Sequence, residues 1–348
     1  MKFDDPSSYT LNEALIRDLK YRYVDITTNE KGEELTRGAV LLVHGYPDTW
    51  FTWHKLIERL VQSGYRCIVP STVGYCGTVV IWFLRIDKES PEDLRRYTRV
   101  EIAKDMNALL DYINVSQVFV VGHDWGSLIS QRFSALFPNR VKKLAVLSVP
   151  YFPPARAKHS IETLIAAGYD LLKYQLVWRE DVTINRLDSS EAKLKSFFAN
   201  LFSYPTDQDT RPACANLQDS GSERWEKEVH PQTAHKSSLL GEHYEWHVEQ
   251  FRKHGMRGPC SYYKVWEINS ELELDVPLGF EMPFMQIIFQ GEPIFSDEKK
   301  KEYAEASDDL FKTIVVPDGI THWYMLEKPD LICKYILEWI QDDVKSTL

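Results

Sequence analysis

The chain has 348 residues, of which 44% are hydrophobic and 26% are charged, and this composition is typical of a soluble globular protein with a sizeable core. Its 51 acidic and 41 basic residues give a net charge of −10, which argues against nucleic acid or an anionic membrane as the main partner. The five cysteines are scattered without zinc-ligand spacing, and no apolar run is long enough to span a bilayer, so we expect a cytoplasmic protein.

The first part of the chain alternates predicted strands and helices. It begins without an apolar signal region. Residues 39–43 form a continuous run of β-branched and other apolar residues, as expected for a strand buried on both faces. The strand–helix order predicts a mostly parallel central sheet with helices on both faces. The predicted strands are 21–27, 39–43, 67–70, 117–121 and 141–149, and the predicted helices are 53–63, 99–113 and 127–136.

The pattern changes after Pro150, where three prolines lie close together. Residues 155–268 are mostly helical in pattern, polar and aromatic, and strand patterns return only at 285–289 and 313–316, before a helix at 330–340. We therefore predict one α/β core, residues 1–150 and 271–348, interrupted by an inserted α-helical cap, residues 151–270. The last three residues, Ser346-Thr347-Leu348, resemble the peroxisomal signal only faintly.

The most informative motif is Gly122-His123-Asp124-Trp125-Gly126, which follows a predicted strand and precedes a predicted helix. This spacing is typical of a nucleophile elbow, a sharp turn that exposes its central residue and needs small neighbours where strand and helix cross. The central residue is Asp124, whose carboxylate is already ionised and can attack an alkyl carbon to form an ester. An aspartate before a helix is also a favoured N-cap, so the motif alone does not decide its role.

Two further segments lie where a hydrolase of this kind needs them. His44-Gly45-Tyr46-Pro47 follows the strand at 39–43, in the loop that supplies one backbone N–H of an oxyanion hole. The predicted donors are the N–H groups of Tyr46 and Trp125, and we interpret the side chain of His44 as structural. His322 lies in a loop between the last predicted strand and the terminal helix, the place of a catalytic histidine.

These motifs resemble those of the epoxide hydrolases of the α/β-hydrolase fold. His44-Gly45-Tyr46-Pro47-Asp48, followed by Trp50 and then by the elbow, is specific for this group and its haloalkane and haloacetate dehalogenase relatives. The match runs from about residue 21 to the end of the chain. The resemblance implies an apolar epoxide as substrate, a vicinal diol as product, contacts of the substrate with Pro47 and Trp125, and no metal or organic cofactor.

The predicted cap carries the two contexts that favour an epoxide over a halide. Epoxide hydrolases hold the epoxide oxygen with two cap tyrosines, and the matching segments place these at Tyr174 and Tyr263. The first lies in Lys173-Tyr174-Gln175-Leu176, and the second follows Gly255-Met256-Arg257-Gly258-Pro259. A phenol suits this task because it stays protonated at neutral pH. The resemblance then implies an ester on Asp124 that water, activated by His322, hydrolyses.

The chain departs from the family at the acid that normally orients the histidine. That aspartate position falls on Pro293, with Glu292 beside it as a substitute, and the alternative position after the strand at 141–149 offers only Ser148. Three hypotheses follow: an intact epoxide hydrolase using Glu292, a slow enzyme that forms the ester but hydrolyses it poorly, and a non-hydrolytic cyclase or binding protein. A dehalogenase is a fourth, but it does not explain the paired tyrosines.

Two other patterns carry less weight. His243 and His247 stand four residues apart on a predicted helix, but the order is H-x-E-x-H and no third ligand is evident, so we predict no metal site. The run Val79–Leu84 is apolar where the family has a polar loop, and it suits a cleft lining or a surface patch equally well.

Overall fold

A single sheet organises the molecule. The structure is a computed structural model that describes residues 1–80, 92–202, 238–290, 297–305, 310–316 and 321–342. Within these residues the strand order is β1-β2-β4-β3-β6-β7-β8-β9, and β5 pairs with β2. The pairs from β4 to β9 are parallel, whereas β1, β2 and β5 join by antiparallel pairing, so the predicted mostly parallel sheet is confirmed. The strands are β1 (Leu11–Ile16), β2 (Leu19–Ile26), β3 (Ala39–Val43), β4 (Arg66–Pro70), β5 (Val79–Val80), β6 (Val118–His123), β7 (Val141–Leu147), β8 (Phe284–Phe289) and β9 (Phe311–Val316).

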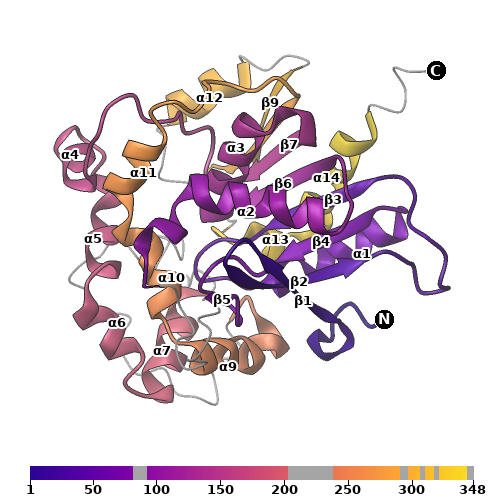
Figure 1. Cartoon of the computed structure of the whole chain (residues 1–348), viewed down its shortest axis with the longest axis horizontal. Helices are drawn as coiled ribbons and strands as arrows, with labels where there is room; N and C mark the ends of the chain where they lie inside the picture. The colour runs from indigo at the N-terminus through magenta and orange to yellow at the C-terminus, as the bar shows by residue number, and fades with distance from the viewer. Residues whose placement is uncertain (81–91, 203–237, 291–296, 306–309, 317–320, 343–348) are drawn as a thin grey trace.

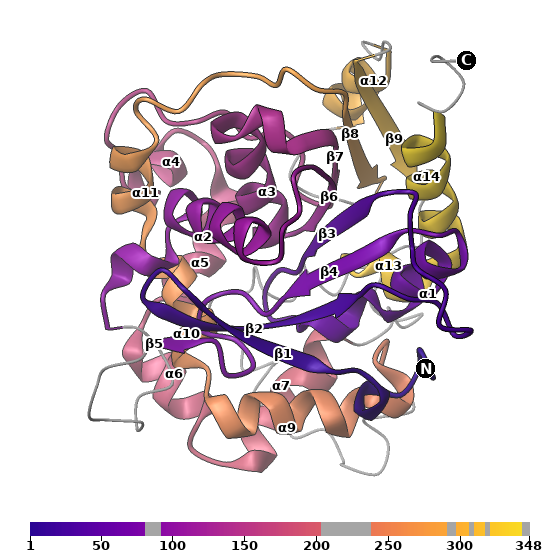
Figure 2. The same cartoon turned by 45° about the vertical axis from the view of Figure 1, so that its right-hand side comes forward.

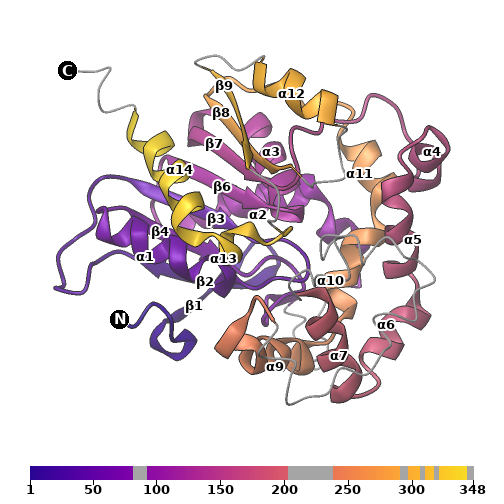
Figure 3. The same ribbon diagram turned by 180° about the vertical axis from the view of Figure 1, so that it is seen from behind.

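Helices cover both faces of this sheet. In Figure 1, α2 and α3 lie in front of the strands, and Figure 3 shows α1, α13 and α14 on the opposite face. Because both faces are covered, all residues of β3, β6 and β8 are buried, which explains the apolar sequence of β3 and the largely apolar sequences of β6 and β8. The helices are α1 (His54–Gln62), α2 (Arg99–Tyr112), α3 (Trp125–Leu136), α4 (Ile161–Ala166), α5 (Tyr174–Trp178), α6 (Asp181–Leu187), α7 (Glu191–Leu201), α9 (Tyr244–His254), α10 (Arg257–Ser261), α11 (Trp266–Leu272), α12 (Asp297–Glu305), α13 (Tyr324–Glu327) and α14 (Pro329–Gln341).

Local sequence signals set several helix ends. The hydroxyl of Thr98 accepts a hydrogen bond from the N–H of Glu101, which caps the first turn of α2. Pro329 occupies the first position of α14, where its missing N–H costs nothing. Gly255 ends α9 with a φ of +72°, a conformation that glycine adopts without strain. Within the described ranges, every helix is too short or too polar to cross a membrane.

The named elements between β7 and β8 are all helices within the described residues, joined by loops. The helices α4 to α11 belong to this segment, and Figure 2 shows α6, α7 and α9 gathered at one edge of the molecule, away from α14. This segment occupies the place in the chain of the predicted cap, residues 151–270. Of the apolar run at 79–84, Val79–Val80 forms β5, and the remainder lies outside the described residues.

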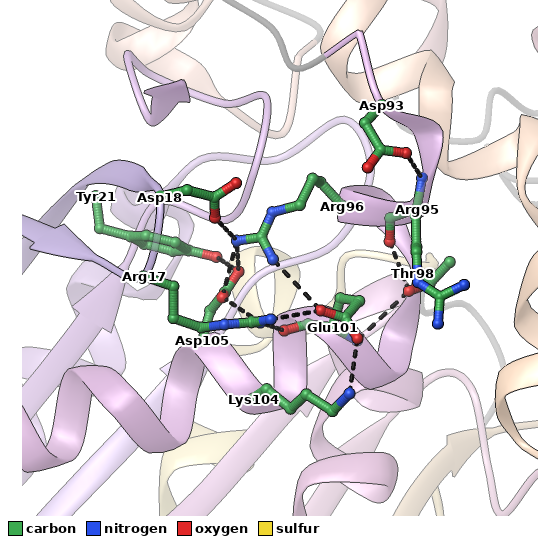
Figure 4. A network of polar contacts seen from close by, with 10 residues as sticks. All are labelled: Arg17, Asp18, Tyr21, Asp93, Arg95, Arg96, Thr98, Glu101, Lys104 and Asp105. Atoms are coloured by element: carbon green, nitrogen blue, oxygen red, sulfur yellow. Dashed lines mark hydrogen bonds and ion pairs between the residues drawn. The ribbon is translucent and has the colours of Figure 1, made fainter. Parts of the chain in front are cut away.

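A buried polar network fixes the β1–β2 hairpin against α2 (Figure 4). Asp105 in α2 is fully buried and accepts hydrogen bonds from the Tyr21 hydroxyl at 2.9 Å and from Arg17 Nη1 at 2.8 Å. Arg96 reaches the same carboxylate at 3.0 Å, and Arg17 also bonds Glu101 at 2.6 Å. The hairpin is therefore tied to the helix that leads into β6, the strand that carries Asp124.

Candidate active site

The turn between β6 and α3 places Asp124 at the carboxyl end of the sheet. Its φ of +53° lies in the left-handed region, which is strained for a residue with a side chain. The turn is tight enough to exclude side chains at both flanking glycines. A Cβ on Gly122 would lie 2.4 Å from the carbonyl oxygen of Gly126, and one on Gly126 would lie 2.1 Å from that of Val43. The glycine spacing predicted from the sequence therefore has a direct steric reason.

The loop after β3 contacts Asp124 through Gly45 and Tyr46. The backbone N–H of Tyr46 donates to Oδ1 of Asp124 at 2.7 Å. A Cβ on Gly45 would lie 2.5 Å from the Cβ of Asp124, so only glycine allows this approach. Trp125, the other predicted donor residue, begins α3 directly after Asp124.

His322 lies near the other oxygen of the Asp124 carboxylate. Its Nε2 atom is 3.5 Å from Oδ2 of Asp124. The carbonyl oxygen of His322 accepts hydrogen bonds from Nε2 of His123 and from the hydroxyl of Ser148, both at 3.0 Å. Two residues far apart in sequence thus hold the backbone of His322 in place.

Asp48 contacts His123 and Trp323, which lie beside the backbone of His322, although the sequence analysis gave Asp48 no role. Its buried carboxylate lies 3.1 Å from Nδ1 of His123 and accepts the indole N–H of Trp323 at 3.1 Å. Asp48 and His123 both belong to the motifs that carry the family resemblance, which was the only available signal. The side chain of His44, as predicted, bonds backbone: its Nε2 accepts from the N–H of Thr72 at 3.1 Å, and its Nδ1 lies 3.0 Å from the carbonyl oxygen of Gly45.

The surroundings favour an ionised Asp124. Burial acts to raise the pKa of this carboxyl, but the contact with His322, the imidazole of His123 and the N–H of Tyr46 outweigh it. The resulting pKa is below the ordinary value for aspartate. The carboxylate therefore keeps the negative charge that a nucleophile at carbon requires.

The two predicted tyrosines, Tyr174 and Tyr263, lie next to each other, and Tyr263 packs against Tyr46 and Trp125. Tyr263 is buried, and its ring packs edge-on against Tyr46 and Trp125, with ring centroids 4.9 and 5.4 Å away. The half-buried ring of Tyr174 lies 6.0 Å from that of Tyr263. Burial raises the pKa of Tyr263 well above its usual value, and Tyr174, Asp124 and Tyr46 act in the same direction. The phenol of Tyr263 therefore stays protonated at neutral pH.

Pro47 joins the loop after β3 to the helical segment. It is buried, and its carbonyl oxygen lies 3.0 Å from Nε2 of His247 in α9. His243, one turn earlier, instead packs against Phe51 and His54, with ring centroids 4.9 and 5.2 Å away. In the parts of the chain that the structure describes, no three histidine, cysteine, aspartate or glutamate side chains are grouped as metal ligands.

The position expected for the acid that orients His322 is occupied by Pro293, and Glu292 beside it is the predicted substitute. Both lie outside the described residues. At the alternative acid position, Ser148 directs its hydroxyl to the carbonyl oxygen of His322. Ser148 therefore contacts the backbone of the histidine rather than its imidazole.

Comparisons with known proteins identify the family of the chain. The family model for the alpha/beta hydrolase fold matches residues 38–329. The chain is 24% identical to bifunctional epoxide hydrolase 2 of Mus musculus over 94% of its length, and it spans 57% of that longer relative. It is 26% identical to epoxide hydrolase 3 of Siraitia grosvenorii, covering 90% of this chain and 97% of the relative. The crystal structure of an epoxide hydrolase from Vigna radiata superposes with a TM-score of 0.74 at 22% identity, covering 96% of this chain and 99% of that one. The resemblance predicted from the motifs is thus confirmed.

Proposed function

The chain belongs to the alpha/beta hydrolase fold family, and we propose that, within this family, it hydrolyses apolar epoxides to vicinal diols through an ester on Asp124. The observation that carries the proposal is the aspartate at the elbow, with Oδ1 held by the N–H of Tyr46 and Oδ2 facing His322. The sequence similarity to enzymes named epoxide hydrolases supports the same substrate class.

In the first half-reaction the epoxide ring opens. An oxygen of Asp124 attacks one ring carbon, so that a new ester C–O bond forms as the ring C–O bond breaks. The departing oxygen takes a proton from the hydroxyl of Tyr174 or Tyr263, which hold it during attack. Oδ2 is the suitable nucleophile because Oδ1 already accepts the N–H of Tyr46.

In the second half-reaction water cleaves the ester. His322 takes a proton from a water molecule, whose oxygen attacks the carboxyl carbon of Asp124. Negative charge develops on Oδ1, where the N–H of Tyr46 already points, and we expect the N–H of Trp125 to become the second donor. Collapse releases the diol, whose departing oxygen takes the proton from His322, and leaves Asp124 as a carboxylic acid. The acid gives up its proton and becomes a carboxylate again, and the tyrosine that protonated the epoxide oxygen takes up this proton, directly or through solvent.

The substrate class follows from the side chains around Asp124. Tyr46, Trp125 and Tyr263 are buried aromatic residues, and Trp178 packs against Tyr46 with ring centroids 6.0 Å apart. Such a lining favours an apolar, aromatic epoxide over a charged one.

Mass spectrometry after exposure to styrene oxide tests the proposal. A transient adduct on Asp124, with diol in solution and heavy oxygen from labelled water entering Asp124, supports the full cycle. A persistent adduct without diol indicates ester formation with poor hydrolysis. Unreacted epoxide and no adduct overturn the proposal and favour a binding protein, while halide release from a haloalkane favours a dehalogenase.

A further inference from the structure

Gln175, the residue after Tyr174, connects that tyrosine to a buried tryptophan. The amide Nε2 of Gln175 donates to the hydroxyl oxygen of Tyr174 at 3.2 Å. Its Oε1 accepts the indole N–H of Trp266 at 2.5 Å. Gln175 and Trp266 are 4% and 5% exposed, so solvent does not compete for the bond between them.

The chemistry of the indole determines the orientation of the amide. A side-chain amide can be turned over to exchange its donor and acceptor ends, but an indole N–H only donates. Oε1 of Gln175 must therefore face Trp266, which leaves only the NH₂ group to face Tyr174. The hydroxyl oxygen of Tyr174 is consequently an acceptor in this bond, and the phenolic proton points elsewhere.

Trp266 itself is held firmly by groups from other elements. The guanidinium of Arg99 in α2 lies 5.3 Å from the centre of the indole ring. Nε of Arg99 is 2.8 Å from Oε1 of Glu273, which is fully buried. The ring also packs against Trp125, with ring centroids 6.4 Å apart. The tryptophan thus gives Gln175 a donor whose position is fixed by the core and by α11, which lies beside α5 in Figures 1 and 3.

We propose that Gln175 is a positioning residue that sets the direction of the hydrogen bond at Tyr174, so that the phenol directs its own proton toward the epoxide oxygen. The inference rests on the proposed function. It adds that Tyr174 is prepared for proton donation before substrate arrives, because Trp266 fixes the amide and the amide fixes the phenol. The preorganised donor then needs no reorientation during ring opening.

Replacing the amide of Gln175 by a carboxylate reverses the direction of its hydrogen bond with Tyr174 while keeping the size of the side chain. In Gln175→Glu, an ionised carboxylate accepts from both Trp266 and Tyr174, so the phenolic proton is committed to the carboxylate. We expect ester formation on Asp124 to slow by about 10²-fold at neutral pH, within the usual contribution of a general acid. Rapid-quench mass spectrometry with styrene oxide in single turnover measures this rate.

The pH profile separates this role from a structural one. As the pH falls, the new carboxyl becomes protonated and can donate to Tyr174, so the rate of Gln175→Glu is expected to rise toward that of the parent protein. Gln175→Met has no group that titrates and is expected to show a smaller, pH-independent loss. A flat profile for Gln175→Glu at the parental rate overturns the inference.

A double-mutant cycle with Tyr174→Phe completes the test. If Gln175 acts through Tyr174, then Gln175→Glu costs nothing further once the phenol is absent. An equal loss in the Tyr174→Phe background shows a general packing defect and overturns the inference. Failure of the parent protein to form any ester instead refutes the proposed function, so the two failures are distinguishable. Thermal denaturation of each variant confirms that the folded state is compared.

Discussion

Nε2 of His322 lies 3.5 Å from Oδ2 of Asp124, whereas the N–H of Tyr46 donates to the other carboxylate oxygen, Oδ1. The two oxygens of one carboxylate therefore have different surroundings. Oδ1 is fixed by a backbone donor, and Oδ2 faces an imidazole. In the proposed mechanism, the oxyanion would form at Oδ1 beside the backbone donor, and water would be activated by the imidazole near Oδ2.

Removing the imidazole should stop the reaction halfway. In His322→Gln, we expect the ester on Asp124 to form and to persist, with diol turnover reduced roughly 10³-fold because the general base is lost. Intact-protein mass spectrometry after exposure to styrene oxide measures the adduct. The double variant Asp124→Asn/His322→Gln is the control and should carry no adduct, because an amide is a poor nucleophile. Diol production by His322→Gln at the parental rate would contradict the assignment.

The elbow should tolerate no side chain at its second glycine. A Cβ at Gly126 would lie 2.1 Å from the carbonyl oxygen of Val43, the last residue of β3, and 2.6 Å from that of His44, the next residue. Gly126→Ala is therefore expected to lower the free energy of unfolding by about 2–4 kcal/mol. Urea denaturation followed by circular dichroism measures the change.

Ser134→Ala is the matched control for this substitution. Ser134 lies in the same helix, α3, and is fully buried, but its hydroxyl makes no hydrogen bond among the described residues. Its removal is expected to change the unfolding free energy by less than about 1 kcal/mol. Equal effects of the two substitutions would mean that the strand–helix crossing at Gly126 is looser than the geometry indicates.

Local sequence patterns predicted the centre of the sheet well and its edge poorly. The strand predicted at 39–43 is β3 (Ala39–Val43), because a parallel strand buried on both faces must be apolar throughout. β1 (Leu11–Ile16) was not predicted, since it contains Asn12, Glu13 and Ala14, which are uncommon in strands, and only Ala14 and Ile16 are buried. Its strand conformation depends on antiparallel pairing with β2, a contact between segments that no short window displays.

The same division applies to the candidate site. Asp124 and Tyr46 were predicted because each lies at a fixed offset from a strand end, and parallel strands bring such ends together. The contact of Gln175 with Trp266 joins residues 91 positions apart and has no such offset. Side-chain orientation across the helical segment is decided by packing, so only the structure reveals it.

A buried charge cluster should hold the helical segment to the core. Oε1 of Glu273 lies 2.8 Å from Nε of both Arg99 and Arg132, and the carboxylate is fully buried. Glu273→Gln would leave two buried guanidinium groups without a countercharge, so we expect a loss of about 3 kcal/mol in unfolding free energy. Urea denaturation measures the loss. The control is Glu271→Gln, two residues earlier, which removes only an exposed pair with Lys158 and should have no measurable effect. Similar stabilities for both variants would contradict a structural role for the cluster.

Ester formation should continue at alkaline pH when Tyr263 is the only tyrosine that can protonate the epoxide oxygen. Burial raises the pKa of Tyr263 well above its usual value of about 10, so the protonated, donating form persists to higher pH than for an exposed tyrosine. In Tyr174→Phe/His322→Gln, ester accumulates and Tyr263 is the remaining acid. We expect its single-turnover rate of ester formation to stay constant from about pH 7 to pH 10.

The sign of this prediction follows from which protonation state reacts. Ring opening needs the neutral phenol, so a raised pKa extends the active range upward, whereas an ordinary pKa would halve the rate near pH 10. Circular dichroism at each pH verifies that the variant remains folded. A decline in rate with a midpoint at or below pH 10, in protein that is still folded, would show that the site does not hold Tyr263 in its neutral form, and its packing against Tyr46 and Trp125 would then have no catalytic consequence.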